Sequence, residues 1–278
     1  MRPGPRGGPG DFPTRLARTE RLLAGAADGA AAHRPLVLLA SVLDHQRRRH
    51  EVLRLDPASS DRFPLLDLDA LVPTVVPEVG RAVDELRGSV PVPLAEAGEQ
   101  LTALQPTELA AIVETWFDDI GLVEPRLSFW IHVAAGPALE RGAGQVTAPK
   151  DWAGAACPVC GGPPQASVIA EASGEFMAGS PRSLVCGRCA NWWSFPRVTC
   201  VGCGEQDPRR IETYFDEDRP WARVDTCTTC GAYVKTFDLR APGSVDVVPL
   251  VDDVATLSLD IWARDRGLTR PTLAPSGV

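Results

Sequence analysis

The sequence has no apolar run of about 18 residues, the length that a helix needs to cross a bilayer, so we expect no membrane insertion. It also has no Gly-rich phosphate loop, no nucleophile elbow and no HExxH motif. Histidines are few, and none is close to a cysteine in the chain. His45 and His132 fall in segments with helical patterning, where a structural histidine is expected. No catalytic residue can be read from the sequence, and it predicts a protein that is not an enzyme.

Positive charge is also scarce. The chain has 28 basic and 36 acidic residues, with a net charge of −8, and residues 151–240 hold 11 acidic against 9 basic groups. Nucleic-acid binding depends on Lys and Arg that neutralise phosphates, so no nucleic-acid partner is expected. The first residues, MRPGPRGGPGDFP, carry charge but lack the apolar core of a signal peptide. We therefore expect a disordered tail over 1–13 and a cytoplasmic location.

The first half of the chain has the apolar spacing of helices. PLVLLASVLDHQRRRHEVLRL (35–55) and TELAAIVETWFDDI (107–120) repeat apolar residues every three to four positions. A further helix is expected to begin near Pro77, because proline is tolerated in the first turn of a helix. This periodicity ends in GQVTAPKDWAGAAC, which is typical of a linker. It returns only in DDVATLSLDIWARDRGL (252–268), near the end of the chain.

All eight cysteines lie between residues 157 and 230, and each belongs to a Cys-x-x-Cys pair. In a reducing compartment this pattern indicates metal ligation rather than disulfides. One such turn presents two thiolates to an ion, and a second turn completes a tetrahedral shell, so eight ligands suit two ions. Four thiolates suit either iron or zinc, and the spacing does not separate these metals.

An internal repeat predicts which pairs share an ion. The first and third pairs begin 43 residues apart, and the second and fourth begin 41 residues apart. A strand-like run follows the second and the fourth pair, ANWWSF and GAYVKTF. The predicted metal ligands are Cys157, Cys160, Cys186 and Cys189 at site 1, and Cys200, Cys203, Cys227 and Cys230 at site 2. The alternatives are an interleaved cross-brace, a set of thioredoxin-like dithiols, and Cys₄ sites that only hold a small fold together.

Both zinc ribbons and rubredoxin-like modules use such cysteine turns, and the rest of the region is rich in glycine and β-branched residues. The sequence therefore predicts an α+β protein with an N-terminal all-helical domain, two tandem rubredoxin-like or zinc-ribbon modules and a C-terminal helix. The expected segments are a disordered tail (1–13), the helical domain (14–143), a linker (144–156), the first module (157–199), the second module (200–245), the C-terminal helix (246–270) and a loose tail (271–278).

Four motifs, in this order and spacing, resemble the formate dehydrogenase accessory protein family, FdhE. They are CPVCGGPPQASVI, SLVCGRCANWWSFPRVTCVGCG, VDTCTTCGAYVKTFDL and VDDVATLSLDIWARDRGL, and they cover about residues 157–268. In the helical half, LARTERLLAGAA and PLVLLASVLDHQ resemble the family more weakly.

The resemblance implies a cytoplasmic protein that an active formate dehydrogenase needs and that acts on the catalytic subunit of that enzyme before export or assembly. It also implies a helical domain followed by two rubredoxin-like modules, each able to hold iron. The family's pattern includes no established catalytic residue, so the resemblance implies functional roles for the eight cysteines only. Two other classes of function remain open, a rubredoxin-like electron carrier and a zinc-ribbon regulatory protein.

Overall fold

Among the described residues, helices predominate between Phe12 and Ala143, and the first strand begins at Pro164. The structure is a computed structural model that describes residues 10–25, 30–55, 60, 62–170 and 182–271. The helices are α1 (Phe12–Gly25), α2 (His33–Val52), α3 (Val72–Leu86), α4 (Val92–Thr102), α5 (Pro106–Asp118), α6 (Pro125–Ala143), α7 (Pro249–Ala255) and α8 (Leu257–Arg264). The strands are β1 (Pro164–Ile169), β2 (Arg182–Cys186), β3 (Trp192–Phe195), β4 (Ile211–Phe215), β5 (Ala222–Cys227) and β6 (Tyr233–Asp238).

The two predicted tails lie mostly outside the described residues. At the N-terminal end, α1 begins at Phe12, within the range in which the sequence predicts a tail. Phe12 is 3% exposed and packs in an apolar cluster with residues of α2 and α7. Burial of this aromatic ring stabilises the start of the helix. The polar composition of the segment gives no sign of this helix start.

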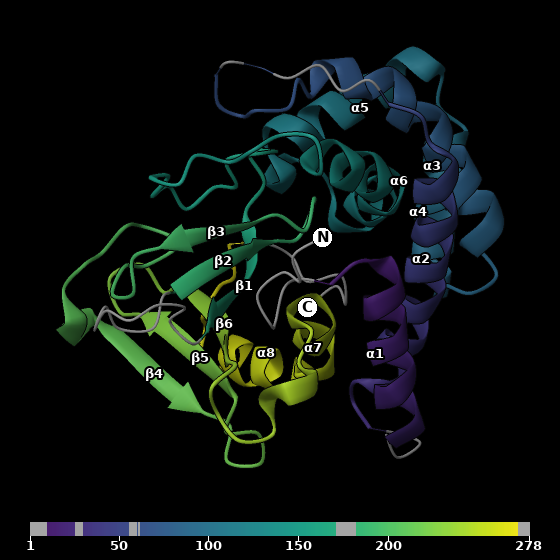
Figure 1. The fold of residues 1–278 in the computed structure, drawn as a ribbon. Coiled ribbons are helices and arrows are strands. Elements are labelled where there is room, and N and C mark those ends of the chain that lie inside the picture. The colour runs from purple at the N-terminus through teal and green to yellow at the C-terminus, as the bar shows by residue number, and fades with distance from the viewer. Residues whose placement is uncertain (1–9, 26–29, 56–59, 61, 171–181, 272–278) are drawn as a thin grey trace.

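Helix α6 lies at the centre of the helical half, packed against α2, α3 and α4 (Figure 1). Its Trp130 and Ile131 are fully buried, as are Val75 and Val79 of α3. This burial follows the three-to-four-residue spacing that the sequence shows. The expectation that a helix begins near Pro77 is wrong, because α3 begins at Val72 and continues through Pro77. The lost backbone hydrogen bond is offset by the apolar face that α3 buries.

All six strands form one sheet, in the order β3-β2-β1-β6-β5-β4. Neighbouring strands are antiparallel except β1 and β6, which pair in parallel with Ser167 opposite Thr236. Strands β1 to β3 come from the first cysteine unit, and β4 to β6 come from the second. The two units are therefore halves of a single sheet, joined by the parallel pair.

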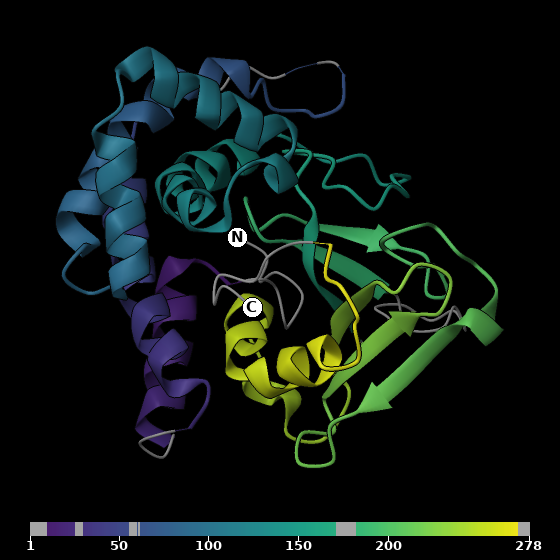
Figure 2. The ribbon, with the colours of Figure 1, turned by 180° about the vertical axis from the view of Figure 1, so that it is seen from behind.

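The two faces of the sheet have different neighbours. Because side chains alternate along a strand, Tyr233, Lys235 and Phe237 of β6 share one face, and Val234 and Thr236 share the other. Helices α7 and α8 cover the first face, as Figures 1 and 2 show from opposite sides. The second face carries a row of polar side chains near site 2.

The C-terminal helical region consists of two short helices that meet at Thr256. A buried charge network fixes them to the sheet. Lys235 Nζ lies 2.9 Å from Asp253 Oδ1 and 2.5 Å from Asp260 Oδ2, and Arg270 pairs with the same two carboxylates. Two cations thus balance two anions, which reduces the cost of burying all four.

Three kinds of contact join the helical half to the sheet. The backbone N–H groups of Leu65 and Leu66 donate to the carbonyl oxygens of Pro158 and Val159, inside the first cysteine turn. The guanidinium of Arg18 on α1 pairs with the carboxylate of Asp252, and apolar residues of α1, α2 and α7 form a shared cluster. In the described part of the chain, we find no helix with the length and apolar character needed to cross a bilayer.

Candidate metal centres

Each Cys-x-x-Cys pair is a tight turn that ends in a left-handed residue. Three of these residues are glycines, Gly161, Gly204 and Gly231, with φ between 69° and 76°. The fourth is Ala190, with φ of 54°, a conformation that is strained for a residue with a Cβ. In all four turns the N–H of the first cysteine donates to the carbonyl five residues later. The four turns therefore share one backbone design, as the repeat in the sequence indicates.

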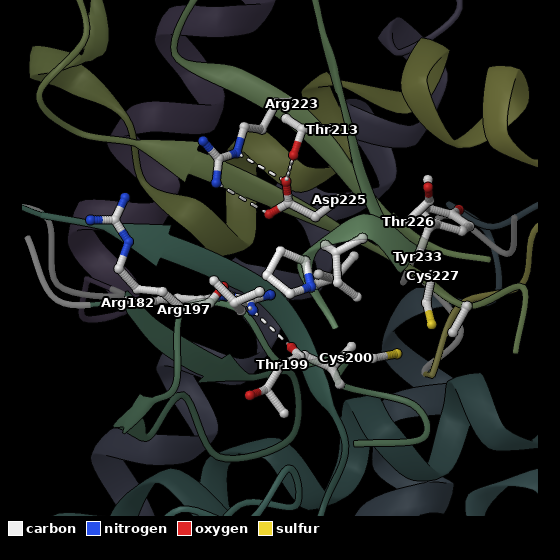
Figure 3. A pocket seen from close by; sticks show the side chains of 16 residues that line it. Arg182, Arg197, Thr199, Cys200, Thr213, Arg223, Asp225, Thr226, Cys227 and Tyr233 are labelled. Carbon is white, nitrogen blue, oxygen red and sulfur yellow. Dashed lines mark hydrogen bonds and ion pairs between the residues drawn. The ribbon is translucent and has the colours of Figure 1, made fainter. Parts of the chain in front are cut away.

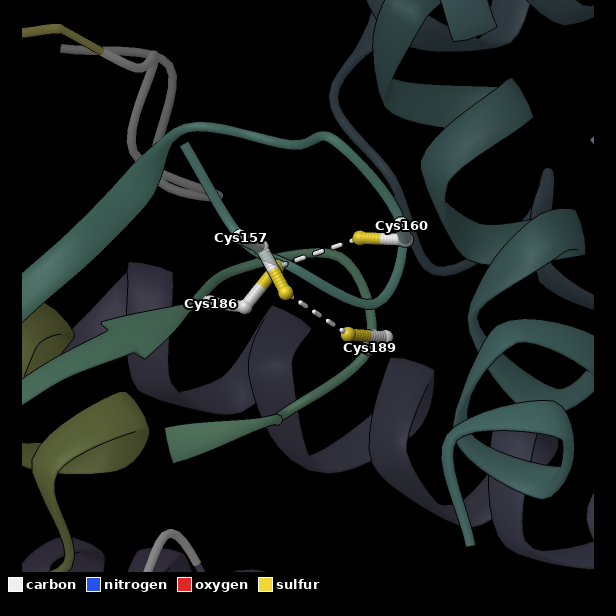
Figure 4. A group of neighbouring side chains, drawn as sticks. All are labelled: Cys157, Cys160, Cys186 and Cys189. Carbon is white, nitrogen blue, oxygen red and sulfur yellow. Dashed lines mark hydrogen bonds between the residues drawn. The ribbon is translucent and has the colours of Figure 1, made fainter. Parts of the chain in front are cut away.

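Site 1 brings together the first two turns, from the segments before β1 and after β2 (Figure 4). The Sγ atoms of Cys157 and Cys189 lie 3.6 Å apart, and those of Cys160 and Cys186 lie 3.4 Å apart. A tetrahedral ion with metal–sulfur bonds of about 2.3 Å requires sulfur separations of about 3.8 Å. The four thiols are thus spaced for one ion and too far apart to be disulfide-bonded.

Site 2 repeats this arrangement with the third and fourth turns. Sulfur separations are 3.6 Å between Cys200 and Cys230 and 3.8 Å between Cys203 and Cys227. In each site, all four sulfur atoms lie within 4.8 Å of one another. The sequential grouping of the cysteines is the one found, and no sulfur of the first unit joins a group with one of the second among the described residues.

Burial of the thiols at site 1 favours a bound cation. Burial raises the pKa of Cys186 and of Cys189 well above the usual value for a thiol, because charged sulfur is poorly solvated there. Backbone amides offset part of this cost, since the N–H of Arg188 donates to Cys186 Sγ at 3.4 Å. Four thiolates suit a soft or borderline ion such as iron or zinc, and these residues fit either metal.

The two sites differ in their access to solvent. At site 1 all four cysteines are buried, whereas at site 2 Cys203 and Cys230 are exposed. The helical half covers site 1, and its cysteines belong to the same apolar cluster as the core of α3 and α6. Site 2 lies at the far side of the sheet, where only one small cluster of apolar residues surrounds its buried cysteines.

Arg188, between the two cysteines of the second turn, was not singled out from the sequence. Its guanidinium donates to the carbonyl oxygens of Trp116 and Phe117 at the end of α5, at 2.6 and 3.2 Å. A lone arginine in a Cys-x-x-Cys turn gives no signal of this role, because its partners are backbone atoms of a distant helix. Together with the backbone hydrogen bonds of Leu65 and Leu66, it ties site 1 to the helical half.

The histidines lie apart from both sites: none joins a cysteine group in the part of the chain that the structure covers. His45 Nδ1 lies 2.8 Å from a carboxylate oxygen of Glu85, which agrees with a structural role, although its Nε2 is buried without a partner. His132 lies on α6 near Trp116, with ring centroids 6.2 Å apart.

Comparison with known proteins places the chain among similar sequences and folds. Residues 198–275 match the family model described as FdhE, C-terminal domain. The chain is 29% identical to an FdhE homolog of Aquifex aeolicus over 178 residues, which is 64% of this chain and 61% of that protein. It is 31% identical to an FdhE homolog of Shewanella baltica over 212 residues, which is 75% of this chain and 64% of that protein.

A solved structure has the same fold over nearly its whole length. The crystal structure of the FdhE protein from Pseudomonas aeruginosa matches with a TM-score of 0.71 and 22% identity, covering 98% of this chain and 96% of that one. The sequence matches are shorter, since the chain spans a little under two thirds of the length of the two curated relatives above.

Proposed function

We propose that this chain belongs to the FdhE family and is an accessory factor that a formate dehydrogenase needs in order to become active. The observation that carries the proposal is the match of residues 198–275 to the FdhE C-terminal domain, because this stretch contains all of site 2 and both C-terminal helices. In this proposal the factor works in the cytoplasm, binds the catalytic subunit of the dehydrogenase, and has no turnover of its own.

The eight cysteines hold two metal ions in this proposal, iron or zinc, one at each Cys₄ group. Sulfur separations of 3.4–3.8 Å support it. A shell of four protein ligands leaves no open position on the ion for a substrate, whereas catalytic zinc sites keep one. The ion at site 1 then acts as a scaffold between the sheet and the helical half. The ion at site 2 lies where a partner protein can reach its ligands.

A genetic test addresses the client directly. The gene is deleted, formate oxidation is assayed in extracts, and the strain is complemented with the wild-type gene or with a Cys227→Ser/Cys230→Ser variant. We expect activity to be lost in the deletion strain, restored by the wild type and not restored by the variant. An Arg87→Gln variant, changed at an exposed residue of the helical half, serves as the matched control. Normal formate oxidation in the deletion strain, with no paralogue present, contradicts the proposal.

Binding to the catalytic subunit is tested separately. A tagged copy of the chain is used to recover partners from cell extract, and the proteins are identified by mass spectrometry. We expect the catalytic subunit of a formate dehydrogenase, and we expect the Cys227→Ser/Cys230→Ser variant to recover less of it. Equal recovery by the variant and the wild type would show that client binding does not depend on the cysteines of site 2.

Electron transfer is a second candidate function, favoured by the exposure of Cys203 and Cys230. An exposed Cys₄ iron site is accessible to a redox partner, whereas site 1 is sealed. The purified, iron-loaded protein is titrated with a reductant while its visible absorption is followed. Reversible bleaching together with electron transfer to an acceptor protein at enzyme-like rates favours the carrier over the accessory factor.

A further inference from the structure

A pocket of about 250 Å³ lies on the polar face of the sheet, beside site 2 (Figure 3). A single ordered water needs roughly 10–15 Å³ by the same measure, so the pocket has room for a small molecule. Its wall includes two ligands of site 2, Cys200 and Cys227, and apolar side chains such as Val201 and Val234. Neither the proposed function nor the two metal ions account for it.

Three arginines and one aspartate line this pocket, so its side chains other than the two cysteines carry an excess of two positive charges (3 − 1), in a protein whose net charge is −8. They come from separate segments: Arg182 begins β2, Arg197 follows β3, and Arg223 and Asp225 lie on β5. Strand register places Arg223 and Asp225 on the same face, with Thr213 of β4 opposite Asp225. A local cationic cluster in an acidic protein is a site that attracts anions.

Arg182 is a buried cation whose hydrogen bonds go only to neutral groups. It is 5% exposed, and its Nε donates to Ser167 Oγ at 2.8 Å. Its Nη1 donates to three carbonyl oxygens, the nearest being that of Thr199 at 3.0 Å. Within the described residues no carboxylate lies in ion-pair range of this guanidinium, and its Nη2 donates no hydrogen bond. Burial lowers the pKa of Arg182 because desolvation disfavours its charged form, and the carboxylate of Asp225 offsets part of this effect.

The other two arginines complete the cluster in different ways. Arg223 Nε lies 3.1 Å from Asp225 Oδ1, and Thr213 and Thr236 donate to the same carboxylate, so Asp225 is already engaged. The side chain of Arg197 is exposed and has no hydrogen bond or ion pair in the described structure. No sulfur of site 2 accepts a hydrogen bond from these arginines among the described residues. Their free donors are therefore available to a ligand.

We propose that this pocket binds a small phosphate monoester, with the phosphate between Arg182, Arg197 and Arg223 and the organic part against the apolar wall. Planar guanidinium groups pair well with the oxygens of a phosphate dianion, and Arg182 and Arg197 both have donors without a carboxylate partner. The volume exceeds the need of a bare ion, and Val201, Val234 and Ile211 offer an apolar surface to an organic group. A carboxylate, with a single charge, fits the cluster less well.

Binding is measured by isothermal titration calorimetry on the metal-loaded full chain, at constant ionic strength set with chloride. The probes are inorganic phosphate, phenyl phosphate and benzoate. We expect saturable binding of both phosphates, tighter for phenyl phosphate, and benzoate at least about tenfold weaker. Arg197→Gln removes one charge-assisted hydrogen bond and weakens phenyl phosphate binding about tenfold or more. Because Arg197 is exposed and unpartnered, this variant keeps the fold, and Arg87→Gln is the matched control.

The position of the ligand is read by ³¹P relaxation. With Co²⁺ loaded at both sites, phosphate bound beside Cys200 and Cys227 is broadened by the ion at site 2. At the same phosphate concentration, Arg197→Gln reduces this broadening in proportion to its weaker binding, and Arg87→Gln leaves it unchanged. Absence of saturable phosphate binding, or equal binding by Arg197→Gln, overturns the proposal. If the arginines only neutralise the thiolates of site 2, Arg197→Gln instead changes the rate of metal release and leaves the heat of phosphate binding unchanged.

Discussion

The guanidinium of Arg188 lies over the indole of Trp116, 4.2 Å from the ring centroid, and donates to the backbone carbonyl of the same residue. Arg188 is part of a cysteine turn at site 1, and Trp116 is a fully buried residue of α5. One side chain therefore connects the first Cys₄ group with the core of the helical half. The geometry combines a cation–π contact with hydrogen bonds that a shorter or neutral side chain cannot make.

Replacing Arg188 with Met should loosen this connection. The change leaves the carbonyl oxygens of Trp116 and Phe117 without a donor in a buried place, which costs about 2–4 kcal/mol in the free energy of unfolding. Unfolding in guanidinium chloride, monitored by tryptophan fluorescence, measures this loss in the free energy of unfolding. An Arg87→Met variant, exposed on the helical half, is the control and should change stability by less than about 0.5 kcal/mol. Equal stability of Arg188→Met and the wild type would show that the contact contributes nothing.

The two sites should release metal at different rates. Site 1 is buried and site 2 has two exposed cysteines, so a chelator reaches the ion at site 2 first. We expect two phases of metal release in the presence of a chromogenic chelator, each accounting for one ion per chain. Cys203→Ser should accelerate or remove the fast phase and leave the slow phase intact. Release of both ions in a single phase would contradict the expected difference in chelator access between the two sites.

Loss of ligands at site 1 should unfold more of the protein than loss at site 2. Metal binding contributes directly to folding free energy, and site 1 shares its core with the helical half. We expect Cys157→Ser/Cys160→Ser to lower the helical circular dichroism signal and to abolish client binding. Cys227→Ser/Cys230→Ser, the matched pair at site 2, should retain most of the helical signal. A Cys157→Ser/Cys160→Ser protein with full dichroism and client binding would refute the scaffold role.

Ala190→Gly should stabilise the protein. Ala190 has φ of 54°, whereas the equivalent positions of the other three turns are glycines. Relief of left-handed strain is worth about 1 kcal/mol, less the entropy that glycine gains in the unfolded chain. Thermal unfolding of the metal-loaded protein measures the shift. Ala138→Gly inside α6 is the same chemical change in a helix and should destabilise by about 1 kcal/mol. A lower midpoint temperature of unfolding for Ala190→Gly would show that the left-handed backbone at this position is not strained.

Acid should destabilise the helical half through His132. Burial, and then the charges of Arg188 and Arg15, lower its pKa to about 4. In the unfolded chain the pKa is 6.5, so the unfolded state binds more protons between these values, and stability falls as pH drops through this window. The loss at pH 4 is at most about 3 kcal/mol, at about 1.4 kcal/mol per pKa unit. In His132→Gln, the free energy of unfolding should depend less steeply on pH between 6.5 and 4. An unchanged slope would exclude His132 as the cause of the acid destabilisation.

The features that could be predicted from the sequence are those set by local residue spacing. Cysteine spacing and the repeat of the two units indicated two Cys₄ groups, and three-to-four-residue spacing indicated the helices. The family resemblance from the same motifs is confirmed by the comparisons. The parallel pairing of β1 with β6 was not readable, because the register of strands far apart in the chain depends on tertiary packing. The contacts of Arg188 and Arg182 were not readable for a related reason, since most of their hydrogen-bond acceptors are backbone carbonyls, which carry no residue-specific signal.

The parallel pair of β1 and β6 also sets an order for events on the ribosome. Strand β1 ends at Ile169, but its partner begins only at Tyr233, so more than sixty further residues are synthesised before that edge can close. From Cys189 onward in this interval, the first unit has a complete set of cysteines and an open strand edge. Metal capture at site 1 can therefore precede completion of the sheet, and the nascent chain has a half-built domain that an early-binding chaperone can protect.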